Sequence, residues 1–457
     1  MNYNEFLKTK EYKYEPSGFE CDPSNENLFD FQKAIVKWAL AKGKSALFLD
    51  TGLGKTLCQL SWAYEVSKYT GGRILILAPL AVSVQTKREG EKFGIAVNIC
   101  RTQEDVKSGI NITNYEMIDH FNADEFVGIV LDESSILKSF SGKTTQLLID
   151  KFRYTDYKLA CSATPAPNDY EELGNHSEFL GIMSRTEMLA TYFVHYGKDT
   201  SKWRLKGHAK NDFWKWLASW AVVVKNPEDI GFDGEKYKLP KLNIYKHTVS
   251  AKAQKGKLIS TAVLDLKDRR DSRKESLNDR VSLCAELVKD MDSCLVWCDF
   301  NDEGNALEKA IENSVQVQGS DTSEHKEKSL LAFSDGDIKY LVTKPKIAGF
   351  GMNWQNCHNI IFCGLSDSYE KYYQAIRRCW RFGQKKEVNV HIVISSRDLP
   401  VYNNVMNKEK MAFEMNNNMI EITSEMFKTE IAKATMRETT PYIAELEMKL
   451  PDWEEMK

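Results

Sequence analysis

Short, nearly continuous apolar runs recur along this chain. Each is followed by a polar loop and then by a stretch in which apolar residues have helical spacing. In the first half the runs are SALFLD, RILILAP, VNIC, INITN, VGIVLDE and YKLACSAT. Apolar character on both faces is typical of strands in a parallel sheet that helices cover on both sides. The first half is therefore predicted to be an α/β unit.

The same layout starts again in the second half, with the runs SCLVWCDF, VQVQG, IKYLVTK, NIIFCG and VNVHIVIS. This repetition predicts two α/β units in one chain. We expect an N-terminal extension at 1–25, a first lobe at 26–184 and a second lobe at 246–400.

The segment between the two lobes, residues 185–245, is rich in tryptophan and ends in Gly, Asp and Pro. Aromatic residues interleaved with basic ones can stack bases and bind phosphates. More often such tryptophans form the core of a small helical unit. We expect a helical insertion or linker here, followed by a charged helix within 251–290. Its mixture of basic and acidic residues favours a solvated face for Lys267, Arg269, Arg270, Arg273 and Lys274.

Residues 401–457 follow the second lobe, and YNNVMNKEKMAFEMNNN within them has the composition of a helix. We expect a helical C-terminal extension, which is a candidate for docking a protein partner.

Composition narrows the class of protein. The 457 residues carry a net charge of −3, so a nucleic-acid contact would need a local basic surface. No apolar run has the length of a membrane span, and the first residues lack the apolar core of a signal peptide. The ten cysteines include no C-x-x-C pair. We therefore expect a cytoplasmic protein with reduced thiols and no membrane partner.

The stretch ALFLDTGLGKTLCQL combines a strand, a glycine-containing turn and a helical pattern. Gly52 and Gly54 would let backbone N–H groups surround a phosphate chain at the positive end of the following helix. Lys55 is expected to reach the β- and γ-phosphates, and Thr56 to hold Mg²⁺ through its hydroxyl. The competing interpretation is a strand–turn–helix junction with a solvated lysine.

Two adjacent acids follow a later strand in VGIVLDESS. The carboxyl ends of parallel strands share one edge of the sheet, so Asp132 and Glu133 are expected beside the glycine turn. Asp132 suits binding of Mg²⁺, and Glu133 suits orienting an attacking water.

The stretch QAIRRCWRFGQ, residues 374–384, contains three arginines. Gln374, Arg378 and Arg381 are spaced i, i+4 and i+7, so on a helix they share one face. Such a row of guanidinium groups suits an anion. The competing interpretation is a helix whose arginines pair with Glu370 or with solvent.

Taken in order, these motifs resemble those of the superfamily-two helicases and translocases. Within that group they are most similar to the Swi/Snf-type DNA-dependent ATPases, especially the compact forms in bacteria and their phages. The resemblance runs from about Leu28 to Ser395. It implies an α/β fold of two RecA-like parallel-sheet lobes that bind ATP and Mg²⁺ and act on nucleic acid.

The resemblance also implies roles for further residues. LFDFQ is similar to an adenine-reading motif and nominates Gln32, and CSATPAPND is similar to a coupling motif that contains Ser162, Ala163 and Thr164. APLAVSVQ, ITNYE and VQGS are similar to loops that touch a nucleic-acid backbone. They nominate Pro79, Thr113, Asn114, Tyr115, Gly319 and Ser320. AGFGMNWQ falls where the second lobe contacts nucleic acid, and its Gly349 and Gly351 are candidates for nucleotide binding.

In the family, the arginines at the positions of Arg378 and Arg381 reach across a cleft to nucleotide held by the first lobe. A guanidinium fork suits a γ-phosphate that gains charge as it leaves. Arg377 stands where most of the family has another residue, and we interpret it as a neighbour only. DESS has Ser135 where the family usually has His or Asp, so the link from hydrolysis to movement can differ from the family's. SAT is commoner among strand-separating helicases, whereas YEKYYQAIRRCWRFGQ is more similar to the Swi/Snf type, which leaves duplex and single-stranded DNA both open.

The leading hypothesis is an ATP-driven translocase on double-stranded DNA. One alternative is a strand-separating DNA or RNA helicase. Another, from a different class, is a nucleotide-gated DNA-binding subunit that serves a nuclease or methylase. Intact Lys55, Glu133 and Arg381 argue against an inactive ATPase.

Overall fold

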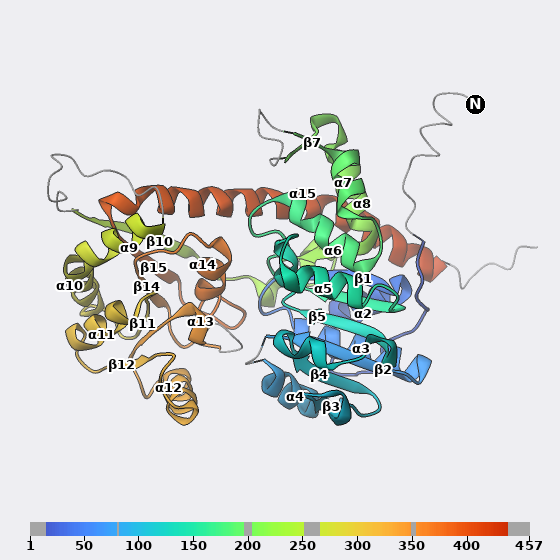
Figure 1. Cartoon of the computed structure of the whole chain (residues 1–457), viewed down its shortest axis with the longest axis horizontal. Coiled ribbons are helices and arrows are strands. Elements are labelled where there is room, and N and C mark those ends of the chain that lie inside the picture. The colour runs from blue at the N-terminus through green and yellow to red at the C-terminus, as the bar shows by residue number, and fades with distance from the viewer. Residues whose placement is uncertain (1–14, 80–81, 196–202, 251–265, 349–352, 437–457) are drawn as a thin grey trace, which may run out of the picture.

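The structure, a computed structural model, describes residues 15–79, 82–195, 203–250, 266–348 and 353–436. Two α/β lobes lie side by side, and a long C-terminal helix runs along both of them (Figure 1). Each apolar run quoted above forms a strand, and every strand pair within the two large sheets is parallel. The predicted fold class is confirmed.

The first lobe contains a seven-stranded sheet with the order β3-β4-β2-β5-β6-β1-β9. Its strands are β1 (Lys44–Leu49), β2 (Arg73–Ala78), β3 (Val97–Ile99), β4 (Ile110–Asn114), β5 (Phe126–Asp132), β6 (Tyr157–Cys161) and β9 (Ala221–Val224). Its helices include α2 (Asp30–Lys42), α3 (Lys55–Thr70), α4 (Ser83–Lys92), α5 (Lys143–Lys151) and α6 (Leu173–Leu180). Because β6 lies between β1 and β5, the loops after these three strands meet at one edge.

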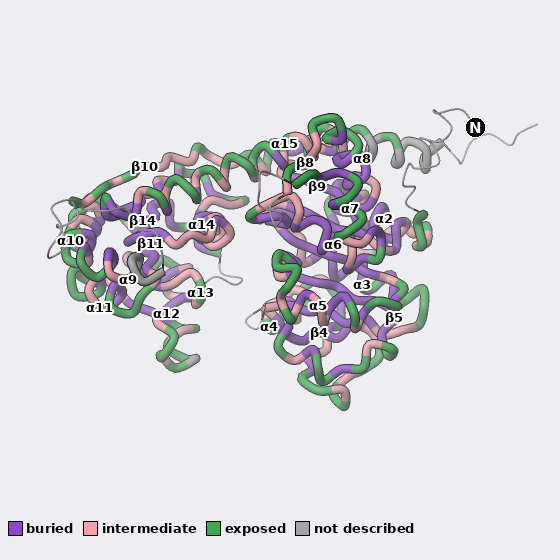
Figure 2. The backbone as a smooth tube through the Cα atoms, turned by 45° about the horizontal axis from the view of Figure 1, so that its top comes forward, coloured by how far each residue is buried: buried purple, intermediate pink, exposed green. Residues whose placement is uncertain are grey.

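Burial on both faces of this sheet explains its apolar runs. Along β1, Ala46 and Phe48 belong to one hydrophobic cluster, whereas Leu47 and Leu49 belong to another on the opposite face. Alternate side chains of a strand point to opposite faces, so a sheet that is covered twice needs apolar residues at every position. The buried interiors of both lobes are visible in Figure 2.

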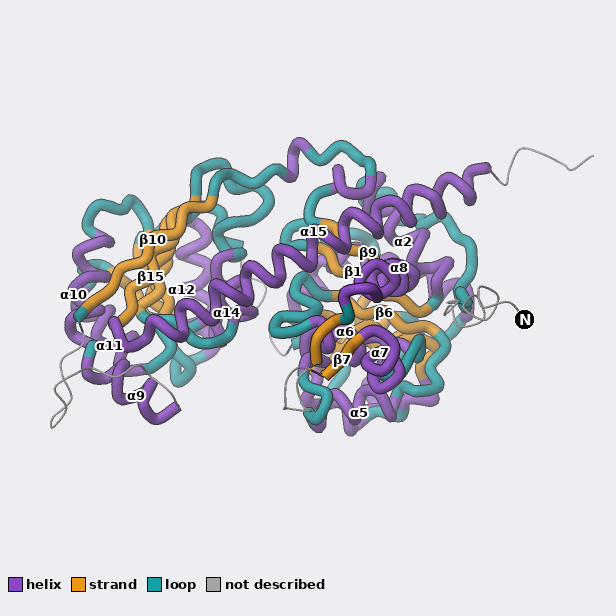
Figure 3. The backbone as a smooth tube through the Cα atoms, turned by 90° about the horizontal axis from the view of Figure 1, so that it is seen from above, coloured by secondary structure: helices purple, strands orange, loops and turns teal. Residues whose placement is uncertain are grey.

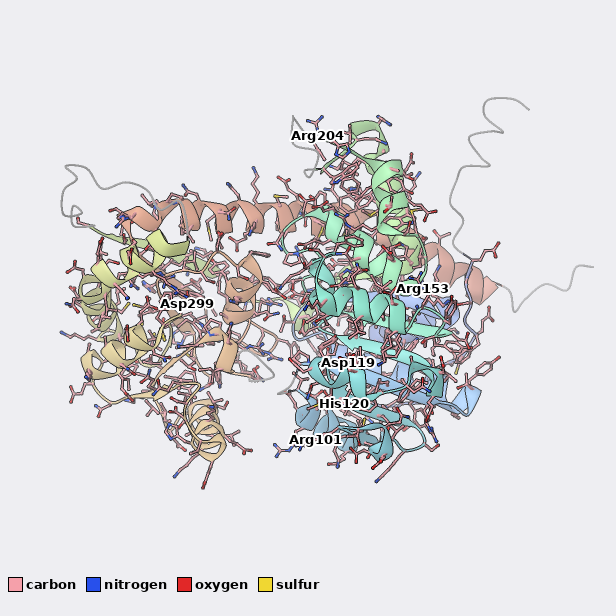
Figure 4. The ribbon with its side chains drawn as sticks, viewed as in Figure 1. Arg101, Asp119, His120, Arg153, Arg204 and Asp299 are labelled. Carbon is pink, nitrogen blue, oxygen red and sulfur yellow. The ribbon has the colours of Figure 1, made fainter. Side chains whose placement is uncertain are left out.

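The tryptophan-rich segment belongs to the first lobe. It contains α7 (Arg185–Tyr192), the hairpin β7 (Phe193–His195) and β8 (Trp203–Leu205), and α8 (Lys210–Trp220), and then β9. β9 pairs with β1 at the edge of the first sheet, so the segment is not simply an insertion between the lobes. Trp214, Trp216 and Trp220 are buried, as the core interpretation predicted. Arg204 of β8 lies at the outer end of this segment (Figure 4).

The second lobe contains a six-stranded sheet with the order β10-β15-β14-β11-β13-β12. Its strands are β10 (Leu242–Val249), β11 (Cys294–Trp297), β12 (Ser314–Val317), β13 (Tyr340–Thr343), β14 (Asn359–Cys363) and β15 (Val388–Ser395). Its helices are α9 (Leu266–Glu275), α10 (Leu277–Val288), α11 (Asn301–Ala310), α12 (Ser323–Asp335), α13 (Pro345–Ala348) and α14 (Tyr369–Ile376). The expected start of this lobe, residue 246, falls inside β10.

The charged helix departs from its prediction at Arg273. Arg273 in α9 is buried, and its guanidinium donates to Glu303 at 3.0 Å and to Asp299 at 3.1 Å. The expected solvated face is therefore wrong for Arg273, because acids from the following elements compensate its charge. Residues 251–265 of the expected segment lie outside the described residues.

The C-terminal extension is helical, as expected, as far as residue 436, and residues 437–457 lie outside the described residues. α15 (Leu399–Met436) begins on the second lobe and continues over the first (Figure 3). Val405 packs into the second lobe, whereas Met415, Met419 and Phe427 pack into the first. This helix thus docks on its own chain, and a protein partner for the extension stays a prediction. Among the described helices, none has the length and apolar character that crossing a bilayer requires.

Candidate active site

The loop between β1 and α3 has the backbone of a phosphate-binding loop. Gly52 and Gly54 have φ of +96° and +78°, in the left-handed region that side chains rarely adopt. A Cβ on Gly54 would lie 2.3 Å from Nε2 of Gln32, and a Cβ on Gly52 would lie 2.9 Å from Cβ of Phe382. Both positions therefore require glycine. Lys55 follows as the first residue of α3.

Gln32 is buried between α2 and this loop. Its Oε1 accepts from the backbone N–H of Phe29, and its Nε2 donates to the carbonyl of Leu53, both at 2.9 Å. The side chain thus ties α2 to the phosphate loop. Recognition of adenine by Gln32 stays a prediction.

The two acids lie at the end of β5, next to the phosphate loop. Asp132 is the last residue of the strand, and Glu133 has a left-handed φ of +54°, which is uncommon for a residue other than glycine. Oε1 of Glu133 is 3.5 Å from Nζ of Lys55. Its Oε2 is buried and makes no hydrogen bond within the described part of the chain. Burial and the charge of Glu133 raise the pKa of Asp132 to about 7.

These residues fit Mg²⁺ bound together with a phosphate chain. The described residues contain no group of three or more His, Cys, Asp or Glu placed to hold a metal. Mg²⁺ usually takes one or two carboxylates and completes its shell with waters and substrate phosphates. Thr56 and Asp132 line one cavity, and a cation there would stabilise the ionised form of the buried Asp132 carboxylate. When bound, Mg²⁺ would neutralise charge on the phosphate oxygens.

This cavity has a volume of about 230 Å³ and is lined by both lobes. The first lobe contributes the phosphate loop, both acids and Ala163. The second lobe contributes Gln374, Arg377, Arg378 and Arg381. The structure thus brings together the predicted phosphate loop, acids and arginines.

The arginines are not on a helix, contrary to the spacing argument. α14 ends at Ile376, and Arg378 and Arg381 lie in the turn that follows. The backbone of this turn bonds to other parts of the lobe: the carbonyl of Arg378 accepts from the N–H of Trp354 at 2.9 Å. The amide of Gln384 also donates to the carbonyl of Cys379 at 3.2 Å. These bonds replace those of a continued helix.

Burial and a neighbouring positive charge lower the pKa of both arginines. Burial and the charge of Arg381 lower the pKa of Arg378 to about 10. Burial and the charge of Arg377 lower the pKa of Arg381. Cations held this closely around one cavity favour an anion between them.

Arg377 is more than the neighbour that the sequence suggested. It is 3% exposed, and its Nη2 lies 2.7 Å from Oδ2 of Asp50 in the first lobe. The same nitrogen donates to the carbonyl of Thr51 at 2.9 Å. Arg377 therefore contacts the phosphate loop directly. Sequence reasoning missed this role, since no local pattern links the two residues.

The predicted coupling residues follow β6, between the phosphate loop and the acids. Ala163 lines the cavity. Oγ of Ser162 accepts from the backbone N–H of Thr164 at 3.0 Å, and both side chains are buried. Their position suits transmission between the lobes, which stays a prediction.

The predicted nucleic-acid residues are more dispersed. Pro79 and Tyr115 line a second cavity of about 550 Å³, and the hydroxyl of Tyr115 donates to the carbonyl of Asp132 at 2.7 Å. Thr113 and Asn114 are buried at the end of β4. Gly319 and Ser320 are exposed after β12, and Gly349 and Gly351 lie outside the described residues. Contact of these residues with nucleic acid or nucleotide stays a prediction.

The second cavity is also lined by lysines that the sequence did not single out. Lys138 from the first lobe and Lys346 and Lys371 from the second line it. The same three lysines line an adjoining cavity of about 700 Å³. A cluster built from elements so far apart in the chain leaves no local sequence signal.

Comparison with known proteins identifies both lobes. The DEAD/DEAH box helicase model matches residues 29–173, and the helicase conserved C-terminal domain model matches residues 279–383. The chain is 22% identical to the ATP-dependent helicase/translocase YwqA of Bacillus subtilis (strain 168), over 90% of this chain and 50% of that protein. It is also 22% identical to the DNA annealing helicase and endonuclease ZRANB3 of Bos taurus, over 84% of this chain and 40% of that protein.

The chain thus spans half or less of the length of these curated relatives. Among solved structures, the Sulfolobus solfataricus SWI2/SNF2 ATPase core in complex with dsDNA matches with a TM-score of 0.43 and 17% identity. The match covers 88% of this chain and 99% of that one. Helicase domains of the two matched kinds imply ATPase activity. With both of these domains in sequence order, the chain belongs to the superfamily-two helicases and translocases.

Proposed function

We propose that this protein is an ATP-driven translocase on double-stranded DNA. The observation that supports this most is the cavity lined by the phosphate loop and acids of one lobe and the arginines of the other. A phosphate chain bound there favours a closed arrangement of the lobes, and its hydrolysis favours reopening. With each cycle of closure and reopening, the contacts that the lobes make with a DNA strand shift along that strand.

Each side chain of the cavity then has a separate role. Lys55 holds the β- and γ-phosphates, while Thr56 and Asp132 hold Mg²⁺. Glu133 orients the attacking water through the carboxylate oxygen that makes no bond within the described residues. Arg378 and Arg381 stabilise the charge that develops on the γ-phosphate.

The two larger cavities support nucleic acid as the partner. Lys346 and Lys371 of the second lobe line both, and so does Lys138 of the first lobe, which is paired with Glu370. Cations along a groove favour a phosphate backbone whatever its sequence. The similarity of YEKYYQAIRRCWRFGQ to the Swi/Snf type favours movement along duplex DNA.

Movement without strand separation gives a direct test. With ATP, the protein is expected to displace a third strand from a triplex and to leave a forked duplex paired. The measurement is the fraction of labelled strand released over time, with Glu133→Gln as the control that cannot drive movement. Release from the fork instead would favour the strand-separating helicase. Binding of DNA that depends on ATP, with release from neither substrate, would favour the nucleotide-gated DNA-binding subunit.

A further inference from the structure

Helix α14 presents one row of side chains to the first lobe. Glu370, Tyr373 and Arg377 are spaced i, i+3 and i+7, so they share one face of the helix and its last turn. All three bond to groups of the first lobe. They therefore connect the two lobes directly.

The first set of contacts is made to the phosphate loop. Nη2 of Arg377 lies 2.7 Å from Oδ2 of Asp50, and the hydroxyl of Tyr373 donates to Oδ1 of Asp50 at 2.5 Å. Asp50 thus receives two donors from the second lobe. Although burial opposes the charge, the Asp50 carboxylate raises the pKa of Arg377, so the guanidinium stays charged. The guanidinium carbon also lies 5.0 Å from the ring centre of Trp380, which helps to hold the fork in place.

The second set of contacts is made to the turn after the acids. Oε1 of Glu370 accepts from Oγ of Ser135 at 2.6 Å, and Oε2 accepts from Nζ of Lys138 at 2.5 Å. Ser135 is buried, and the side chain of Glu370 is 12% exposed. Ser135 follows Glu133 by two residues, so this contact fixes the turn that carries the water-orienting carboxylate.

We propose that α14 aligns the two halves of the ATP site through these contacts, with Arg377 and Glu370 as positioning residues for hydrolysis. This inference rests on the proposed function and adds a means by which closure of the lobes acts on the site. Asp50 lies two residues before Gly52, and Ser135 lies two residues after Glu133. One helix therefore fixes Lys55 and Glu133 relative to the arginines that follow it.

The contact with Asp50 is tested by a double-mutant cycle on the full chain. Asp50→Asn and Arg377→Gln are each expected to lower kcat about tenfold or more, with a smaller change in KM, because close charge pairs across an interface are strongly coupled. The kcat of the double variant should be no lower than that of the slower single variant, since the contact can be lost only once. Tyr373→Phe keeps the ring and should give a smaller fall in kcat.

The contact with Ser135 is tested in the same way with Ser135→Ala, Glu370→Gln and the double variant. Lys386→Gln is the matched control, because it removes an exposed charge from the same lobe, and it should hydrolyse ATP at the parent rate. Thermal unfolding of each variant identifies any general loss of stability. Losses that multiply in either double variant would show independent effects and overturn the proposed contact.

A second readout does not depend on hydrolysis. With a non-hydrolysable ATP analogue, the double variant Arg377→Gln and Glu370→Gln is expected to have a larger radius of gyration in small-angle scattering than the parent. Equal radii would overturn the alignment by α14. Both double-mutant cycles are also measured without DNA. If DNA does not change the rate of ATP hydrolysis, the translocase hypothesis is contradicted, but the cycles still test these contacts.

Discussion

Replacing Arg381 by Ala is expected to lower DNA-stimulated ATP hydrolysis by about 10³-fold or more, the usual worth of an arginine that completes a site in the transition state. This corresponds to roughly 4 kcal/mol of barrier. Arg381 belongs to the second lobe and lines the cavity that holds Lys55 and Asp132 of the first. Because those first-lobe groups are unchanged, the affinity for ATP should change only modestly.

Arg381→Lys should restore little of the lost rate, since a point charge does not reproduce the planar fork of a guanidinium. The measurement is DNA-stimulated ATPase activity of both variants beside binding of a fluorescent ATP analogue. Lys385→Ala, an exposed position in the same loop, is the control. Undiminished stimulation in Arg381→Ala would show that Arg381 does not stabilise the transition state. The proposed role of the second lobe in hydrolysis would then be wrong.

Glu133→Gln is expected to bind ATP and to lose hydrolysis by roughly 10²- to 10⁴-fold, the range that a general base contributes. The amide has nearly the shape of the carboxylate but cannot accept the proton of the attacking water. Loss of the charge 3.5 Å from Nζ of Lys55 should not weaken phosphate binding, since it removes an anion that competes with the phosphates for the lysine.

The check is single-turnover hydrolysis together with analogue binding. Asp124→Asn removes an exposed carboxylate of the same lobe and serves as control. Hydrolysis by Glu133→Gln at the parent rate would show that the base is another residue, and the assignment of the acids would be wrong.

The buried strands could be predicted from the sequence because each is covered on both faces, which leaves an unbroken apolar run. Two strands of the large sheets escaped prediction for different reasons. β9 follows α8 without an intervening polar loop, so AVVV reads as an extension of the tryptophan-rich helix. β10 is an edge strand whose side chains are largely exposed or half-buried, so its apolar residues are diluted by polar ones.

The phosphate loop and the acids could also be predicted, because each is encoded by a few consecutive residues. Contacts between the lobes could not. Ser135 and Glu370 are 235 residues apart, and several acids could have met Arg377 equally well by sequence alone. The end of α14 at Ile376 depends on backbone bonds to distant residues such as Trp354, which a helical spacing argument does not contain.

If closure of the two lobes on ATP drives movement along duplex DNA, hydrolysis depends on the duplex. The measurement is the rate of ATP hydrolysis by the full chain with no nucleic acid, single-stranded DNA, duplex DNA or RNA, at one ionic strength. We expect slow hydrolysis without nucleic acid and the largest stimulation by duplex DNA. Equal rates in all four conditions, or stimulation by RNA alone, would contradict it.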